Sequence, residues 1–555
     1  MVRATFSGFN TALSALQANQ KRLDITGQNL SNMNTAGYTR QQLEASSLNY
    51  TNPVSHYSNG NETAVGFGVS MDRVSQIRDP YLDIQYRSQS ADCSYTNRLQ
   101  TALNSLSKVL DETTISGIRQ AFDDIQSTLT SMQDPAKVSD PIYESELRTK
   151  MQSVCNLFNQ ASRQITQAEQ NEFQRLTGEG SSEQGDVQKI NDILRQIGDL
   201  NVQIKRNQVA GHPSLELQDE RNLLLDELSG YIPIETRYYK DDAHSGNNAY
   251  DYDANGAVIG KKDWPDDLEV SMNYIDAQGK SQKLILVNGS DLGADGLTKN
   301  YGQLSVLNRD HKPAASVSDP ANISIRFEKA PSYQVNGQAA TDVYAELKGI
   351  HFEGGSLQAS LDMLQKTGTG NVINGSVDDV RGYQYYSEKL DQLADTFAKS
   401  MNASNNGNNH KDQNLLSNST DDSTNGITAG NIGISKGWTS GTIHISTDGT
   451  NRTDTILDMI AAMKDTKKLN GKTFADYMNN LSTQLASDSS SNQTALKTGT
   501  TVLNSIQDSR DSLSGVSLDE EATNMMVYVS AYNAASRLMT ALDEVLNTLI
   551  SNTGA

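Results

Sequence analysis

The sequence predicts a multidomain α+β protein, with terminal coiled-coil helices and a long-helix bundle that carries an inserted, mainly β domain. Three patterns in its 555 residues predict this fold. Apolar residues at heptad spacing occupy both ends of the chain, further heptad segments lie inside them, and the longest alternating apolar pattern lies in the middle. Because the helical segments enclose the β segment on both sides, we expect a rod with its globular part at one tip.

A heptad stripe at each end predicts terminal helices within residues 1–70 and 516–555. The N-terminal stripe reads Phe6, Phe9, Leu13, Leu16, Gln20, Leu23, Gly27 and Leu30. The C-terminal stripe reads Ala522, Met525, Val529, Tyr532, Ser536 and Met539, and continues after a slip as Leu542, Leu546 and Leu549. Each apolar stripe needs cover from another element.

The pattern alone leaves two sources of cover open. The terminal helices pair within one molecule, or they stay largely unfolded in the monomer and become ordered by packing against neighbouring subunits. In the second case, the apolar stripe residues are the candidates for subunit interaction: Phe6, Phe9, Leu13, Leu16, Leu23, Leu30, Met525, Val529, Tyr532, Leu542, Leu546 and Leu549.

The inner segments predict a bundle and a β insert. Further heptad segments begin at Leu99, Leu147, Val187 and Leu390, and they predict long helices in residues 71–232 and 352–515. A small β excursion is expected near residues 426–450. Between the two helical segments, residues 233–351 form the predicted outward-facing β domain. Apolar residues alternate there in two runs around the turn cluster 276–279, first Leu268, Val270, Met272 and Tyr274, then Leu284 and Leu286. These two runs predict a hairpin.

Composition argues against several classes of protein. The chain has 46 Lys and Arg against 67 Asp and Glu, a net charge of −21, which is unsuited to following a nucleic-acid backbone. No apolar stretch approaches the roughly 20 residues of a membrane helix, so we expect no membrane insertion. Two cysteines, Cys93 and Cys155, are too few for a disulfide framework or a zinc cluster.

The sequence offers no convincing catalytic, cofactor or metal motif. Residues Asp251 to Gly256 match the first half of a calcium loop, but Lys262 stands where a bidentate Glu is needed. The seven histidines are scattered without metal-ligand spacing. We therefore expect no enzymatic activity, no cofactor and no metal site.

The segment after the first stripe predicts a helix stop. Asn, Thr and Gly crowd residues 29–41, and Gly37 can adopt a positive φ. We expect the chain to turn sharply here and to present Tyr38 and Arg40.

These segments resemble the flagellar axial proteins of the rod and hook family. Residues 28–41 are similar to the N-terminal signature of that family in its junction-protein form, where Pro more often stands in place of Ala36. Residues 514–521, running into the helix around 532–537, are similar to its C-terminal signature. The signature positions are Asn29, Asn32, Asn34, Thr35, Gly37, Tyr38, Arg40, Gly515, Ser517, Leu518, Glu520 and Glu521. The resemblance also includes residues 217–223, which we expect at the end of a helix.

The resemblance implies a structural adaptor of the bacterial flagellum, assembled as a ring at the hook-filament junction and connecting hook to filament. Its partners would be copies of itself, the hook protein, hook-associated protein 3 and the filament. It would be secreted without a cleavable signal peptide, through the flagellar type III export apparatus and with an export chaperone.

Other functions stay open from the sequence. The chain could be another flagellar axial subunit, of the filament or the rod. It could instead be a secreted adhesin or enzyme whose activity lies in the 233–351 insert, or a cytosolic coiled-coil scaffold.

Overall fold

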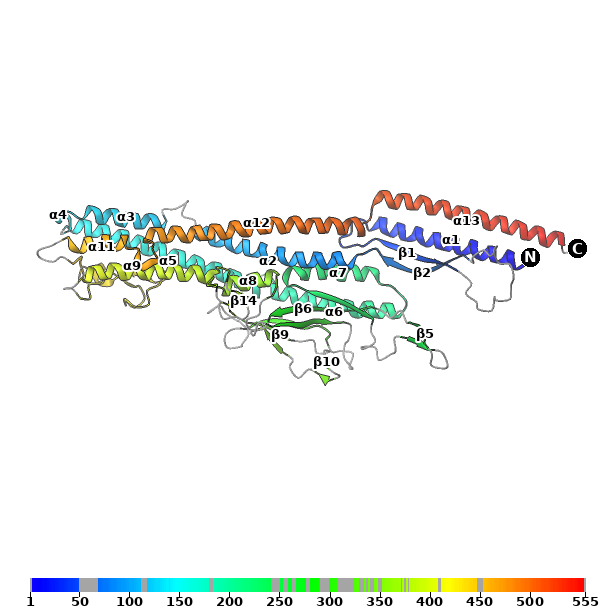
Figure 1. Ribbon diagram of the computed structural model, residues 1–555, viewed down its shortest axis with the longest axis horizontal. Helices are drawn as coiled ribbons and strands as arrows, with labels where there is room; N and C mark the ends of the chain where they lie inside the picture. Colours follow the sequence, from blue (N-terminus) through cyan, green and yellow to red (C-terminus); the bar gives the residue numbers. More distant parts are fainter. Residues whose placement is uncertain are drawn as a thin grey trace.

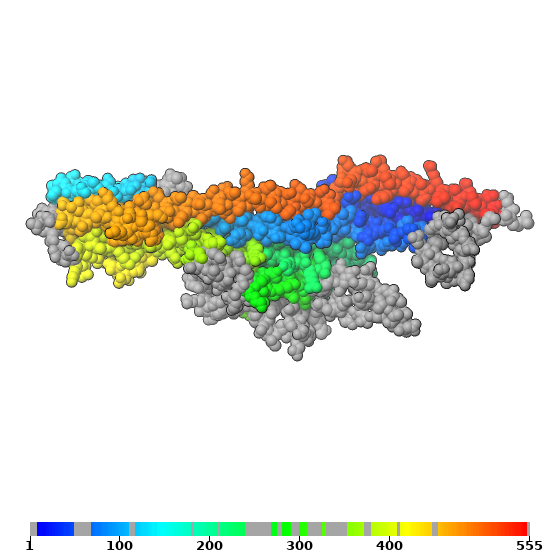
Figure 2. Space-filling view, viewed as in Figure 1, coloured from blue at the N-terminus to red at the C-terminus, as the bar shows by residue number. Residues whose placement is uncertain are grey.

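The computed structural model forms a long rod (Figure 2), with both chain ends together at one end (Figure 1). It describes residues 2–48, 68–110, 117–138, 140–178, 183–240, 250–252, 258–261, 266–275, 280–289, 299–307, 324–328, 334–335, 338–339, 344–347, 352–370, 372–373, 376–377, 379–407, 411–446 and 453–553. In its described part, no helix is long and apolar enough to cross a membrane. The mixed α+β fold that the sequence predicts is confirmed.

The end of the rod that carries both termini consists of four elements, which we call the terminal unit. These are α1 (Val2–Ser31), β1 (Gln41–Ser47), β2 (Val69–Gln76) and α13 (Leu518–Thr553). Helices α1 and α13 lie side by side (Figure 1), and β1 pairs with β2 antiparallel, with Gln41 opposite Gln76. Ala12, Ala18, Ile25 and Ala535 are buried in this unit. The terminal helices therefore pair within one chain, which is the first of the two alternatives.

The remaining described elements, from α2 to α12, form what we call the body. Helices α2 (Pro80–Leu110) and α12 (Phe474–Ser514) run side by side from the terminal unit toward the far end (Figure 1). Helices α7 (Leu215–Tyr231) and α8 (Ser356–Gln365) lie beside α2, and α6 (Asp186–Val209) packs against α7. The far end contains α3 (Ile118–Ser131), α4 (Pro135–Val138), α5 (Pro141–Thr177), α9 (Tyr383–Asn406), α10 (Lys436–Ser440) and α11 (Asp454–Lys464), with a 3-10 turn at Lys467–Leu469.

Helix α5 shows why these segments fold as they do. The Asp140 side chain accepts a hydrogen bond from the Ile142 amide, Pro141 occupies the first turn, and Gly178 ends the helix at φ 75°. The heptad stripe between these caps is buried, as the sequence predicts: Leu147, Met151, Val154, Phe158, Ala161 and Ile165.

Two clusters hold the body together. Phe122 lies at the centre of the far-end core, 5.1 Å from Phe397 and 5.5 Å from Phe474 between ring centroids. Near the middle of the rod, Arg98 of α2 donates to Glu172 of α5 at 2.8 Å and to Asp186 of α6 at 2.7 Å. A buried cation needs such partners, so this cluster fixes three helices relative to one another.

Two three-stranded antiparallel sheets lie on one side of the rod near its middle (Figure 1). One has the order β3-β6-β7, and the other β12-β9-β8. Their strands are β3 (Glu235–Lys240), β6 (Asp266–Ile275), β7 (Ser281–Asn288), β8 (Gln303–Leu307), β9 (Ser324–Glu328) and β12 (Tyr344–Leu347). The expectation of a globular part at one tip is therefore wrong, because α6 holds this part along the side of the rod. Asn201 of α6 donates to the Leu268 and Gly289 carbonyls, both at 3.1 Å.

The predicted hairpin is confirmed as β6 and β7, with Met272 opposite Leu284. Its turn cluster, 276–279, lies outside the described residues. The other short strand pairs are β4 (Tyr250–Tyr252) with β5 (Val258–Lys261), β10 (Gln334–Val335) with β11 (Gln338–Ala339), and β13 (Val372–Ile373) with β14 (Ser376–Val377).

The small β excursion begins earlier than residues 426–450. Strand β15 (Leu416–Asn418) pairs with β16 (Ile432–Ile434). Its position is set by Asn402 of α9, whose side chain donates to the Leu416 carbonyl at 2.7 Å and accepts from the Leu415 and Leu416 amides at 2.9 Å. A polar residue in a helix thus supplies contacts that apolar periodicity does not reveal.

The aromatic cluster generates a stability prediction. We expect Phe397→Ala to lower the free energy of unfolding of the bundle by about 3 to 5 kcal/mol, because the lost ring leaves a cavity among Phe122 and Phe474. Urea unfolding followed by circular dichroism measures this change. Tyr81→Ala is the matched control, since Tyr81 is 64% exposed and its removal is expected to cost no more than about 0.5 kcal/mol. Equal costs for the two variants would contradict the packing role of Phe397.

Candidate functional site

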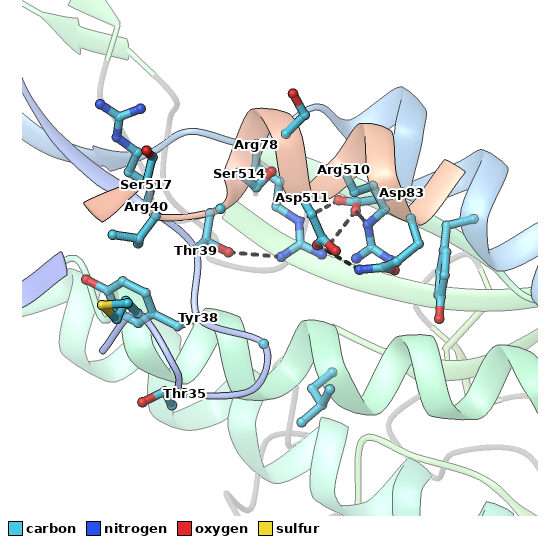
Figure 3. Close-up of a pocket in the computed structure, with 18 of the residues that line it drawn as sticks. Thr35, Tyr38, Thr39, Arg40, Arg78, Asp83, Arg510, Asp511, Ser514 and Ser517 are labelled. Atoms are coloured by element: carbon cyan, nitrogen blue, oxygen red, sulfur yellow. Dashed lines mark hydrogen bonds and ion pairs between the residues drawn. The ribbon is translucent and has the colours of Figure 1, made fainter. Parts of the chain in front are cut away.

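The two terminal signatures meet at Arg40. The Arg40 guanidinium donates from Nε to Glu521 at 2.9 Å and from Nη1 to Glu520 at 2.8 Å. These partners are 481 and 480 residues away from Arg40 in the sequence. The Arg40 backbone N–H donates to the Ser514 carbonyl, at the end of α12, at 2.9 Å. Because Glu521 is only 2% exposed, its carboxylate depends on this cation. Arg40 therefore spans the bend between α12 and α13 (Figure 3).

Asn29 organises the loop that leads to Arg40. Its buried side chain donates to the Gln41 carbonyl at 2.9 Å, and its Oδ1 accepts from the Gln41 amide at 3.0 Å and from the Tyr38 hydroxyl at 2.9 Å. Burial, together with the nearby carboxylates of Asp219, Glu216 and Glu521, raises the pKa of Tyr38 to about 12. The Tyr38 hydroxyl therefore stays protonated and serves as a hydrogen-bond donor.

The turn itself follows the predicted helix stop. Gly37 has φ 78°, in the left-handed region that favours glycine. Thr35 donates to the Asn32 side chain at 3.3 Å, and Asn34 is exposed in the same turn. The turn brings Tyr38 and Arg40 to hydrogen-bond partners within the chain, and both side chains stay half-buried.

The C-terminal signature forms the bend between the helices. A Cβ at Gly515 would lie 2.4 Å from the Asp511 carbonyl oxygen, so only glycine allows this close approach. Ser517 begins α13 by accepting a hydrogen bond from the Glu521 amide at its carbonyl, at 2.9 Å. Leu518 follows and is 52% exposed.

Helix α7 supplies a second polar contact to the loop. Thr39 donates to Asp219 from its hydroxyl at 2.6 Å and from its amide at 3.1 Å. Burial raises the pKa of Asp219 to about 6, and the two Thr39 hydrogen bonds and Arg78 offset part of that effect. Residues 217–223 thus lie in the first turns of α7, so their expected place at a helix end is wrong.

A network of ion pairs lies beneath the loop, and sequence reasoning did not identify it. Arg510 of α12 pairs with Asp83 of α2 at 3.1 Å and with Asp226 of α7 at 2.7 Å. Arg87 of α2 donates to the same Asp226 at 2.8 Å, and Arg78 also pairs with Asp83 (Figure 3). Arg78 and Asp83 are five residues apart, whereas the partners of Arg510 and Arg87 are distant in sequence, so periodicity carries no signal for those longer pairs.

The two signatures and this network line one cavity of about 810 Å³ (Figure 3). Tyr38, Arg40, Arg78, Arg510 and Glu520 are among its lining residues. In the described part of the chain, no group of three or more His, Cys, Asp or Glu could hold a metal ion. Residues 253–257 and 262 of the calcium-like segment lie outside the described residues. The hydrogen bonds and ion pairs around this cavity join helices and set their orientation, so we assign the site a structural role.

The apolar residues predicted for subunit interaction fall into two groups. Half-buried within the single chain are Phe9, Leu16, Leu23, Leu30, Met525, Leu542 and Leu546. Exposed on the surface are Leu13, Val529, Tyr532 and Leu549, at 37% to 44% of their side-chain surface. The Phe6 side chain lies outside the described residues. The most buried apolar residues described in α1 are Ala12, Ala18 and Ile25, which lie outside the predicted stripe.

Asp219 generates a prediction about pH. A raised pKa means that folding disfavours the charged carboxylate, so this penalty is fully present above about pH 6 and is relieved as pH falls toward the ordinary value near 4. Relative to Asp219→Asn, the natural protein should therefore gain stability on acidification, by up to about 3 kcal/mol. Urea unfolding of both proteins from about pH 4 to about pH 8 measures the difference.

Asp124→Asn is the control for this measurement. Hydrogen bonds from Gln120 and Lys150 lower the pKa of Asp124, so its removal should give a pH dependence of the opposite sign. A difference between the natural protein and Asp219→Asn that stays constant with pH would contradict the burial effect.

Comparison with protein families gives three matches along the chain. Residues 103–415 match the model of the flagellar hook-associated protein FlgK helical domain. Residues 9–39 match the flagella basal body rod protein model, and residues 509–552 match the flagellar basal body rod FlgEFG protein C-terminal model. The latter two ranges include the loop before Arg40 and the bend after α12.

Known proteins similar to this chain are also named flagellar hook-associated proteins. The flagellar hook-associated protein 1 of Bacillus subtilis is 28% identical over 568 residues, which cover 99% of each chain. The proteins of that name from Salmonella typhimurium and Escherichia coli are each 28% identical over 41% of this chain, and the match spans 38% and 39% of their own lengths.

A solved structure, that of the flagellar hook junction protein FlgK from Burkholderia pseudomallei, is similar with 18% identity and a TM-score of 0.37. The match covers 60% of this chain and 44% of that one. The helical-domain model alone spans more than half of this sequence, from residue 103 to residue 415. The chain therefore belongs to the family of flagellar hook-associated proteins that contain the FlgK helical domain.

Proposed function

We propose that this chain is a structural subunit of the bacterial flagellum that assembles as a ring at the hook-filament junction and connects hook to filament. Family membership supports the flagellar role, and the names of the similar proteins support the junction. The structural observation that carries the proposal is the terminal unit. Its two helices are fixed side by side at the Arg40 joint, yet apolar residues remain uncovered on both.

The exposed apolar residues of the terminal unit lie on α13 and on α1. On α13, Met526 is 66% exposed, Val529 43%, Tyr532 37% and Leu538 48%, and on α1 Leu13 is 44% exposed. Full burial of an exposed side chain of this kind is worth about 1.5 to 3 kcal/mol, and each of these partly covered residues would gain a fraction of that. We therefore propose that α1 and α13 of neighbouring copies cover these faces in the ring, and that α1–α13 pairing within one chain comes first.

The partners follow from the shape of such a ring. Contacts around the ring repeat between copies, whereas its two rims meet different proteins. We propose the hook protein at one rim, and hook-associated protein 3 and the filament at the other. Delivery through the flagellar type III export apparatus with an export chaperone belongs to the same proposal, and it rests on the resemblance of the terminal signatures.

Localisation tests the proposal directly. Immunogold labelling of isolated hook-basal bodies with attached filaments should decorate one band at the distal end of the hook. A filament subunit would instead be labelled along the filament, and a rod subunit would be labelled within the basal body. Either of these patterns, or a cytosolic protein missing from sheared appendages, would overturn the junction role.

The exposed face of α13 provides a mutational test. We expect Val529→Asp, as the only copy in the cell, to reduce strongly the number of filaments attached to hooks, because it places a charge on a face that assembly buries. Electron microscopy counts the filaments, and motility in soft agar reports the consequence. Thr494→Asp adds the same charge to an exposed position of α12 and should leave attachment unchanged.

Circular dichroism of the purified Val529→Asp protein should match that of the natural protein, since Val529 is exposed in the single chain. Normal filaments on cells with this variant would show that the α13 face is not an assembly surface.

A further inference from the structure

Asparagine followed by glycine is a chemically labile pair, because glycine has no Cβ to shield its backbone nitrogen from the asparagine side chain. The sequence contains this pair eight times. The structure describes four of the eight, which begin at Asn288, Asn406, Asn425 and Asn470. The surroundings of these four pairs differ, and the differences determine which of them can react.

Two of the four pairs are protected by burial or by hydrogen bonds to both reacting groups. Asn288 is 5% exposed, so the surrounding core restricts its side chain. The Asn406 side chain accepts a hydrogen bond from the Gln413 amide at 2.8 Å. The Gly407 amide, which would have to attack that side chain, donates to the Ala403 carbonyl at 3.1 Å. Such contacts must open before the two groups can meet.

The pair at Asn470 is protected on one side only. The Asn470 side chain is exposed, and it offers the closest comparison with Asn425 for that reason. The amide of the next residue, Gly471, donates to the Thr466 carbonyl at 2.9 Å. Because this hydrogen bond holds the Gly471 amide against the preceding turn, its nitrogen can attack only after the turn opens.

The pair at Asn425 has neither kind of protection. Asn425 and Gly426 are both exposed, in the loop between β15 and β16. Within the described part of the chain, no hydrogen bond involves the Asn425 side chain or the Gly426 amide. The hydrogen bonds of this pair use other atoms: the Asn425 amide donates to the Ser423 hydroxyl at 3.1 Å, and the Gly426 carbonyl accepts from Asn431 at 3.0 Å. Both reacting groups are therefore free.

We infer that Asn425 is a site of spontaneous deamidation in the folded protein. The Gly426 nitrogen attacks the Asn425 Cγ, a C–N bond forms, and the side-chain nitrogen leaves as ammonia after taking up the Gly426 amide proton. Water then opens the resulting cyclic imide at one of its two carbonyls, which leaves aspartate or isoaspartate at this position. Ammonia is released, water is consumed and no electrons are transferred, so the reaction needs no enzyme, oxidant or cofactor.

The fold anchors the loop on both sides of this pair. Before it, the Asp422 side chain accepts from the Ser417 hydroxyl at 2.7 Å. After it, Ile427 is 3% exposed, and the Ala429 amide donates to the Asp391 side chain at 2.8 Å. The reaction therefore places a new carboxylate at the exposed crest of an anchored loop, three residues after Asp422. It adds negative charge to the surface while the core stays packed.

The chemistry goes beyond the proposed function and is independent of it. Deamidation at Asn425 involves one chain and water, so the converted fraction rises with the time since the chain folded, wherever the chain is located.

Mass spectrometry of the purified full chain tests this reaction. The folded protein is incubated in neutral buffer below its unfolding temperature and then digested. Trypsin cleaves after Lys411 and Lys436, so Asn425 belongs to the only Asn–Gly pair of its peptide, and fragmentation locates the added mass. We expect conversion at Asn425 to be at least about tenfold faster than at Asn406 and Asn470, because their hydrogen bonds must open first.

Two controls separate the effect of the fold from that of the sequence. In urea, where the chain is unfolded, the pairs at Asn406, Asn425 and Asn470 should react at similar rates, because the protecting contacts are gone. The variant Asn425→Gln keeps an amide but requires a larger ring, so its conversion at this position should be lost. Circular dichroism of fresh and converted natural protein should agree, since the crest of the loop lies outside the core.

Several results would overturn the inference. Equal rates at the three pairs in the folded protein would mean that the fold does not select Asn425. An Asn425 that converts in urea but not in the folded protein would mean that the fold protects it. Unchanged conversion of the peptide in Asn425→Gln would assign the reaction to another residue, and loss of helix alongside conversion would mean that unfolding comes first. Because these rates are measured on the isolated chain, failure of the junction role would leave them unaffected.

Discussion

The Glu521 carboxylate is buried, and the arrangement of both chain ends depends on the cation that neutralises it. A carboxylate at 2% exposure is costly unless a charged donor accompanies it, and Arg40 is that donor at 2.9 Å. Arg40 is itself placed by Asn29, which holds the loop from both sides through Gln41 and Tyr38. One ion pair thereby fixes where α13 begins, and hence how α13 lies along α1.

The rod combines two kinds of cohesion. In the body, apolar packing dominates, and buried polar groups such as Arg98 serve as braces between helices that are already in contact. At the joint, polar groups provide the contacts themselves, and Arg510, Asp226 and Arg87 join α12, α7 and α2 just beneath it. Apolar packing resists bending because interiors are close-packed, whereas polar contacts in reach of water exchange partners.

How far the sequence predicts this structure depends on the range of the interaction. Helix α5 and the β6–β7 hairpin are predictable because their signals lie within a few residues: caps, heptads, and alternation around a turn. The left-handed Gly37 is predictable for the same reason. The ion pair of Arg510 with Asp226 joins residues 284 positions apart, and no local pattern specifies it. The side-on place of the sheets likewise involves polar contacts of α6, such as those of Asn201 and Asn191, which apolar periodicity does not reveal.

Some residues of the terminal stripes are half-buried and others are exposed, and helix geometry explains this difference. The exposed residues affect whether the isolated chain aggregates. A helix can turn only one side toward a single partner, so pairing of α1 with α13 covers Leu542 and Leu546 in part and leaves Val529 and Tyr532 outside. Exposed apolar faces promote association, and a net charge of −21 opposes it through mutual repulsion. Charge repulsion acts between two molecules in any orientation, whereas burial of apolar surface stabilises a contact only when complementary faces meet. Charge repulsion therefore opposes indiscriminate aggregation of this strongly acidic chain, while the assembly that we propose would require its exposed apolar faces to match those of a partner.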